Sequence, residues 1–171
     1  MAEYGAVFWM DASVRLLTND FSSAYAQLRD NGGMMLFKQT KHSNFAATHR
    51  GTYDYIPTNR TRQMRTPMCI ATAILAYNTK AMFYNVLWWF FLCALDRSCQ
   101  APMAKTMCDF DLDNKWATFA DCHKWDQSTL NILLSNYYGY RHHKYLADDQ
   151  LVAVERWPTH RYTIVMNDDR D

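Results

Sequence analysis

The sequence lacks a dominant charge. Among its 171 residues, 18 lysines and arginines nearly balance 17 aspartates and glutamates, so the formal net charge is +1. There is no long basic run, which argues against nucleic acid as the main partner. Charged residues make up 20% of the chain and hydrophobic residues 49%, a composition typical of a globular protein and not of a disordered one. We therefore expect residues 1–171 to form a single domain with its own core.

Several well-known motifs are also missing. The chain contains no GxSxG, HExxH, phosphate-loop or GxGxxG pattern, which excludes the local signatures of α/β-hydrolases, zinc proteases and common nucleotide-binding folds. There is no amino-terminal signal sequence, because Met1-Ala2-Glu3-Tyr4 leads directly into an apolar run. A buried strand so near the first residue predicts that the chain is the carboxyl-terminal part of a longer protein. Any membrane anchor would then belong to the missing segment.

The five cysteines include no pair with the CxxC spacing of a zinc ribbon. Four of them lie close together in sequence, and Cys69 stands apart; the four are Cys93, Cys99, Cys108 and Cys122. We expect these four to form two disulfides, with three pairings open, and Cys69 to be a buried free thiol. Asn59 begins a glycosylation sequon, Asn59-Arg60-Thr61. Disulfides and a sequon together favour the lumen of the secretory pathway.

An apolar run from Ala6 to Met10 opens the chain and stops at Asp11. With no polar residue to mark a wet face, the run predicts a strand buried on both sides, as in a mostly parallel sheet. A carboxylate at the carboxyl end of such a strand lies where open α/β sheets bind their ligands. The alternative is that Asp11 only caps the strand and accepts backbone hydrogen bonds in the turn.

Periodicity and end signals predict the remaining elements. Helices are expected from Asn19 to Asn31, Asn78 to about Leu95 and Asp126 to Gly139, and strands over Val14 to Leu17, Met34 to Phe37, Met68 to Tyr77 and Leu151 to Val154. Residues 38–66 are polar and predict a long loop. The tryptophan-rich helix that ends near Leu95 is apolar nearly all round. We interpret it as a buried core helix, because it is short for the alternative, a membrane span, and contains Asn85.

Three scattered residues are candidates for chemistry. Asp11 follows a strand, Asp126 opens a helix together with Gln127, and His160 lies near the end of the chain. Each has an ordinary structural explanation as well. An aspartate at a helix start stabilises the helix by about 1 kcal/mol through a backbone hydrogen bond, and a surface turn would accommodate His160. Taken one at a time, none of them identifies a site.

Their order, however, resembles a known family. FWMDASVRL, THRGTYDYIP, the helix ending in CALDRSC, and CHKWDQSTLNILLSNYY resemble a family of uncharacterised glycosyltransferase-like proteins from nematodes over nearly the whole chain. CHKWDQSTLNILLSN is the most specific piece. More distantly, a hydrophobic strand followed by Asp, with DQxxLN later, is similar to nucleotide-sugar transferases of the GT-A fold.

The resemblance implies an α/β fold with a GT-A-like (Rossmann-like) mixed sheet flanked by helices, without the amino-terminal part that binds the nucleotide. It also implies site residues. Asp11 and Ser13 match the acidic motif that binds the cofactor, with Arg15 close behind, and Asp126 matches the catalytic carboxylate at a helix start. His160 matches the late histidine that completes the metal site with Asp11. The implied cofactor is Mn²⁺ or Mg²⁺, which would neutralise charge on the leaving diphosphate.

The implied function is transfer of a sugar from a nucleotide-sugar donor to a glycan or protein acceptor, in the Golgi lumen or outside the cell. The alternative is a non-catalytic luminal or secreted domain with a degenerate transferase fold, which binds glycan or protein. Ser13, which stands where a second carboxylate is expected, favours this alternative. The two readings differ in whether the chain binds a nucleotide diphosphate together with Mn²⁺.

Overall fold

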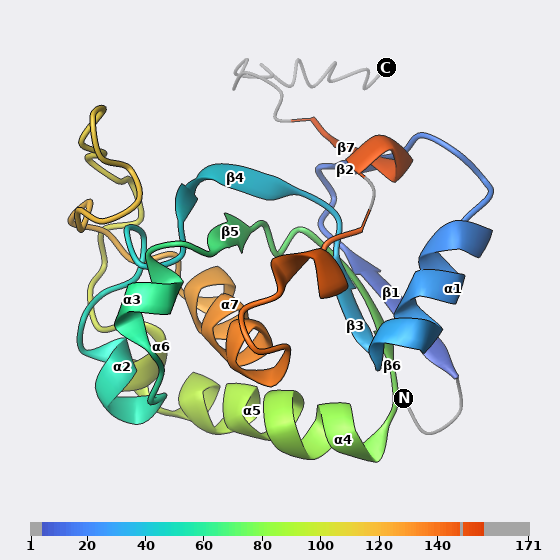
Figure 1. Cartoon of the computed structure of the whole chain (residues 1–171), viewed down its shortest axis with the longest axis horizontal. Helices are drawn as coiled ribbons and strands as arrows, with labels where there is room; N and C mark the ends of the chain where they lie inside the picture. The colour runs from blue at the N-terminus through green and yellow to red at the C-terminus, as the bar shows by residue number, and fades with distance from the viewer. Residues whose placement is uncertain (1–4, 148, 156–171) are drawn as a thin grey trace, which may run out of the picture.

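The computed structural model describes residues 5–147 and 149–155 (Figure 1). The protein is a mixed α/β fold built from helices and small antiparallel sheets. Helix α7 (Asp126–Tyr137) lies in the middle of the molecule in Figure 1, and every residue from Ser128 to Ser135 is buried. Large apolar residues of α7, including Leu130, Ile132 and Leu134, belong to the main hydrophobic cluster. The core is therefore centred on α7.

The largest sheet has three antiparallel strands in the order β1 (Ala6–Met10), β6 (Ala73–Tyr77) and β3 (Met34–Leu36). The prediction that β1 is buried on both faces in a mostly parallel sheet is wrong. β1 lies at the edge of this sheet and pairs only with β6. Because side chains alternate along a strand, Phe8 packs into the cluster around Leu28 while Trp9 on the other face is 48% exposed.

Two further pairs of short strands are antiparallel. β2 (Val14–Leu16) pairs with β7 (Val152–Val154), and β4 (Gln39–Ser43) pairs with β5 (Pro67–Cys69). The single strand predicted from Met68 to Tyr77 is therefore two strands, β5 and β6, which belong to different sheets. Residues 70–72 separate them, and they form one edge of the site described below.

Helix α1 (Ser22–Asn31) follows the prediction closely. Ala24 and Leu28 are its buried residues, and it ends at Gly32, which has a φ of +90°. Only glycine adopts this left-handed conformation without a steric penalty, so the Gly32-Gly33 pair marks the helix end in the sequence.

Residues 38–66 do not form the long loop that their polarity predicts. They contain β4, α2 (Thr52–Tyr55) and α3 (Arg60–Gln63), and several of their polar side chains are fully buried. Gln63 shows the reason. Its amide nitrogen donates to Ser135 Oγ at 2.6 Å, and its amide oxygen accepts from Asn44 Nδ2 at 3.1 Å. Polar groups can lie in a core when they are hydrogen-bonded.

The tryptophan-rich segment is one continuous helical stretch composed of α4 (Lys80–Met82), a π-helical turn η1 (Phe83–Leu87) and α5 (Trp88–Leu95). Thr79 caps it, since its Oγ1 accepts from the Met82 N–H at 3.1 Å. The prediction of a buried core helix is wrong, because α7 occupies the core and this stretch lies on its surface. Val86 and Cys93 face inward, but Trp88 is 47% and Trp89 51% exposed. None of the helices in the described residues has the length and apolar character needed to cross a membrane.

The polar residues of α7 explain how a helix with so many of them can be central. Asn131 spans the gap to β5: its Oδ1 accepts from the Cys69 N–H and its Nδ2 donates to the Cys69 carbonyl, both at 2.7 Å. Ser128 Oγ donates to the Ala47 carbonyl at 2.9 Å. The sequence DQSTLNILLSN therefore encodes a buried helix whose hydrogen-bonding side chains hold neighbouring segments.

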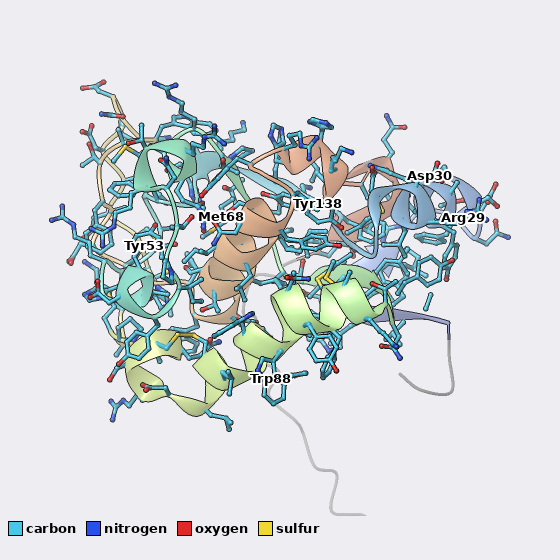
Figure 2. All side chains as sticks on the ribbon, turned by 60° about the horizontal axis from the view of Figure 1, so that its bottom comes forward. Arg29, Asp30, Tyr53, Met68, Trp88 and Tyr138 are labelled. Atoms are coloured by element: carbon cyan, nitrogen blue, oxygen red, sulfur yellow. A yellow bond between two sulfur atoms is a disulfide. The ribbon has the colours of Figure 1, made fainter. Side chains whose placement is uncertain are left out.

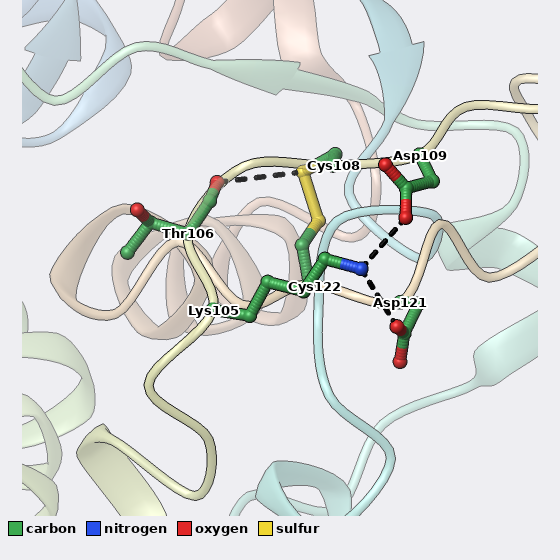
Figure 3. A network of polar contacts seen from close by, with 6 residues as sticks. All are labelled: Lys105, Thr106, Cys108, Asp109, Asp121 and Cys122. Atoms are coloured by element: carbon green, nitrogen blue, oxygen red, sulfur yellow. Dashed lines mark hydrogen bonds and ion pairs between the residues drawn. A yellow bond between two sulfur atoms is a disulfide. The ribbon is translucent and has the colours of Figure 1, made fainter.

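The expected disulfides are present. Cys93 pairs with Cys99, which ties α5 to α6 (Arg97–Gln100), and Cys108 pairs with Cys122. Cys69 is a buried free thiol, as predicted. The second bond closes a loop of irregular structure, which Lys105 also fastens by ion pairs to Asp109 at 2.7 Å and Asp121 at 2.8 Å (Figure 3). Two disulfides are compatible with an oxidising luminal or secreted environment.

Two short 3-10 turns complete the described elements. They are η2 (His142–Lys144) and η3 (Asp149–Leu151). The second leads into β7, which is the strand predicted from Leu151 to Val154.

Candidate functional site

A small pocket lies between the end of β1 and the start of α7. Its volume is about 190 Å³, and its walls are formed by Trp9, Asp11, Ala71, Thr72, Asp126 and Gln127. The two acidic residues that the sequence singled out, 115 positions apart, thus line one cavity. The pocket is more polar than apolar in its lining, which suits a ligand with many hydroxyl or charged groups.

Short backbone contacts fix Asp11 at the pocket. The Asp11 N–H donates to the Thr72 carbonyl at 2.8 Å, so the end of β1 is joined to the segment that links β5 and β6. The break between these two strands places Thr72 beside Asp11. Thr72 Oγ1 is buried and has no hydrogen-bond partner among the described residues.

Asp126 is placed by an unusual turn. Trp125, the residue before it, has a φ of +46°, a conformation that costs a bulky residue energy and occurs at functional sites more than elsewhere. Trp125 is the N-cap of α7, so Asp126 is the first helical residue and lies at the positive end of the helix dipole.

The surroundings of Asp126 change how readily its carboxyl releases a proton. Burial raises the pKa of the Asp126 carboxyl, and the negative charge of Asp11 raises it further. The residue is exposed at the mouth of the pocket, but neighbouring atoms displace part of the water that would solvate its charge. A carboxylate with a raised pKa is a stronger base than an ordinary one.

Other residues of the expected site lie elsewhere or outside the described residues. Arg15 is on β2, where its Nε forms an ion pair with Glu155 at 2.6 Å. The Ser13 carbonyl accepts from the Glu155 N–H at 2.8 Å, at the same strand pair. Neither lines the pocket, so a role of Ser13 and Arg15 in binding a cofactor there stays a prediction. His160 lies outside the described residues.

Asp11 is the expected metal ligand that lines the pocket. Across residues 5–147 and 149–155, no group of three or more His, Cys, Asp or Glu side chains is close enough to hold a metal. Mg²⁺ and Mn²⁺, however, are commonly bound through one or two carboxylates with ligand phosphates and water completing the shell. Asp11 is an oxygen donor of this kind.

The sequon at Asn59 lies on the surface. Asn59 is exposed, and its Oδ1 accepts from the Arg62 N–H at 3.0 Å, which caps α3. The side chain is therefore accessible to a glycosylating enzyme, and the glycosylation of Asn59 stays a prediction.

Sequence reasoning missed three residues of the pocket, Trp9, Ala71 and Thr72. Trp9 was treated as part of a buried run, and nothing in MCIATAIL marks Ala71 or Thr72. Gln127 was named together with Asp126 at the helix start, and it does line the pocket. The strained Trp125 left no trace in the sequence, because backbone strain is imposed by the surrounding packing.

Comparison with protein-family models, with curated protein sequences and with solved structures found no match to this chain. What the protein does must therefore be inferred from its own residues.

Proposed function

We propose that this protein is a glycosyltransferase-like domain of the secretory pathway, and that the pocket between Asp11 and Asp126 holds the sugar at which transfer occurs. One observation carries the proposal: Asp11 and Asp126, the two acidic residues that the resemblance assigns to the site, line the same cavity. A GT-A-like ancestry of the fold belongs to this proposal too. The two disulfides are compatible with the luminal location that it requires.

The size and lining of the pocket support a sugar as the ligand. A volume of about 190 Å³ is below the range of pockets for drug-sized ligands, roughly 300–1,000 Å³, and suits a single sugar ring. Carboxylates and the Gln127 amide can bind vicinal hydroxyls, and the half-exposed Trp9 offers an aromatic face at the rim.

The two carboxyls have different roles in this proposal. Asp126, with its raised pKa, accepts the proton of the acceptor hydroxyl as it attacks the sugar carbon. Asp11 orients the donor and would hold Mn²⁺ or Mg²⁺. When bound, that cation would neutralise the negative charge of the departing diphosphate. The proposed second ligand is His160.

A second candidate is the non-catalytic domain that binds glycan or protein. It is favoured by Ser13, the hydroxyl in the acidic motif, and by a pocket large enough for one sugar ring but not for a whole nucleotide-sugar. In this case Asp11 and Asp126 bind hydroxyl groups and no bond is broken.

Calorimetry with UDP or GDP, with and without Mn²⁺, tests these proposals on protein that includes any segment preceding Met1. The protein is produced without N-glycosylation, because Asp11→Asn and Asp126→Asn each create a sequon with the serine two positions later. If the protein is a transferase, the parent binds one nucleotide only with Mn²⁺, and Asp11→Asn weakens this binding by at least about tenfold. Asp126→Asn retains binding and loses transfer. Asp30→Asn, an exposed carboxylate on α1, is the matched control and should change neither property. His160→Ala tests the second metal ligand.

Binding of a simple sugar without nucleotide, lost in Asp11→Asn, would establish the second candidate and exclude the first. If neither Asp11→Asn nor Asp126→Asn changes the binding of any sugar or nucleotide, both candidates are wrong.

A further inference from the structure

A groove lies on the surface between α2, α5 and the last turns of α7. It consists of two hollows of about 210 and 180 Å³, which share Tyr55, Ile56 and Trp89 in their walls. The groove is far from the Asp11–Asp126 pocket. Asn136, in its wall, is ten residues after Asp126 on the same helix, which is roughly 15 Å along the axis at 1.5 Å per residue.

Aromatic rings from two elements line the shared part of the groove. Tyr55, the last residue of α2, is 45% exposed, and Trp89 of α5 is 51% exposed. Both rings are therefore available to a ligand while their inner edges are anchored in the protein. The face of an aromatic ring is electron-rich and attracts polarised C–H groups.

Polar side chains lie at both ends of this aromatic part. Asn85 and Asn136 line the first hollow, and Asp96 lines the second. Asn85 Nδ2 donates to the Ala81 carbonyl and Asp96 Oδ1 accepts from the Ser98 N–H. Asn85 Oδ1 and Asp96 Oδ2 are the oxygens that can accept hydrogen bonds from ligand hydroxyls. None of the described residues that line either hollow is a lysine or arginine, so the groove carries no cation that would favour an anionic ligand.

We propose that this groove binds two consecutive pyranose residues of a neutral glycan. A pyranose ring presents C–H groups on its faces and hydroxyls around its edge, which matches aromatic walls with amide and carboxylate ends. Each hollow has about the volume of one ring, and two joined hollows fit a disaccharide unit. The proposal does not depend on the function of the Asp11–Asp126 pocket.

The groove is held in shape before any ligand binds. The Cys93–Cys99 disulfide lines the second hollow and joins α5 to α6. In the first hollow, Asn136 Oδ1 accepts from Thr58 Oγ1 at 2.6 Å and from Tyr140 Oη at 3.0 Å. A preformed groove loses little conformational entropy on binding, which raises affinity.

The helix offers a matched pair of variants. Trp88 and Trp89 are neighbours with nearly equal exposure, 47% and 51%, but only Trp89 lines the groove. Trp88 points outward from α5, as Figure 2 shows. Binding through the groove should therefore require Trp89, whereas binding of a flat lipid surface or of a second copy of this chain should require Trp88.

The test titrates the full chain with chitotriose, cellotriose, maltotriose and mannotriose. Tryptophan fluorescence and calorimetry measure the binding. At least one trisaccharide should bind saturably with a Kd below about 10 mM. Trp89→Ala should weaken this binding by about tenfold or more, and Trp88→Ala by less than about twofold. Tyr55→Ala, from the other wall, gives an independent variant if Trp89→Ala does not fold. A trisaccharide bound in the Asp11–Asp126 pocket instead would lose affinity in Asp11→Asn and keep it in Trp89→Ala, so the two sites are tested separately.

Three results would overturn the proposal. The first is that no trisaccharide binds at about 10 mM. The second is that Trp88→Ala weakens binding as much as Trp89→Ala, and the third is that neither Trp89→Ala nor Tyr55→Ala weakens it. The helix would have a different role if no saccharide binds and Trp88 is instead needed for one of two other interactions. These are co-sedimentation with phosphatidylcholine vesicles and dimer formation measured by light scattering.

Discussion

His123 should make the stability of this protein depend on pH. The imidazole is fully buried, next to Cys122 of the second disulfide. Its Nδ1 accepts a hydrogen bond from the His49 N–H at 3.2 Å, and its Nε2 lies 3.1 Å from the Gln100 carbonyl. A backbone N–H can only donate and a carbonyl can only accept, so the ring is neutral, with its proton on Nε2. Protonation of Nδ1 would direct two N–H groups at each other.

Burial is the main cause that lowers the pKa of His123, from 6.5 to about 4. Between these values the unfolded chain binds a proton that the folded chain does not bind. The free energy of unfolding therefore falls as the pH falls from about 6.5 to 4, and the contribution is fully present above that range. At 1.36 kcal/mol for each pKa unit, the loss is about 3 kcal/mol.

Urea unfolding at pH values from about 7.5 to 4 would measure this loss. Other groups titrate in the same range; burial also lowers the pKa of His42, for example. The comparison is therefore between the parent and His123→Gln, whose amide can still donate to the Gln100 carbonyl. The variant should be less stable at pH 7 but should lose about 3 kcal/mol less on acidification. His143→Gln, an exposed histidine on η2, should retain the full slope. Equal slopes in the parent and His123→Gln would refute the reasoning.

Two other predictions concern stability. Asn131→Ala leaves the Cys69 N–H and carbonyl without their side-chain partner, so it should lower the free energy of unfolding in urea by about 3 kcal/mol. The control variant Asn114→Ala, in an exposed turn, should lower it by about 1 kcal/mol or less. Similar losses in the two variants would mean that the buried contacts contribute little. The double variant Cys108→Ser/Cys122→Ser should lower the free energy of unfolding by about 3 kcal/mol, because the bond links cysteines 14 positions apart. In the parent, peptide mapping without reduction should find Cys93 joined to Cys99 and Cys108 joined to Cys122, with only Cys69 alkylated after unfolding; a link between other cysteines would contradict the pairing.

The sequence by itself determined several local elements and their ends. Helix α1 follows from apolar residues at helical spacing and from Gly32, whose left-handed backbone conformation ends it. Thr79 caps the tryptophan-rich stretch through its own side chain. These signals act over a few residues, so the sequence alone carries them. The presence of two disulfides and of a free Cys69 was also predictable from cysteine number and clustering.

Only the tertiary structure decided which helix is the core. Hydropathy favoured the segment around Trp88 and Trp89 as the core helix. A helix with polar residues can nevertheless be buried when each polar side chain has a hydrogen-bond partner. Asn131 finds its partner on β5, 62 residues away in sequence. The tertiary structure likewise placed β1 at a sheet edge and brought Asp11 and Asp126 to one pocket. Such long-range pairings depend on the packing of the whole chain, and no short stretch of sequence encodes them.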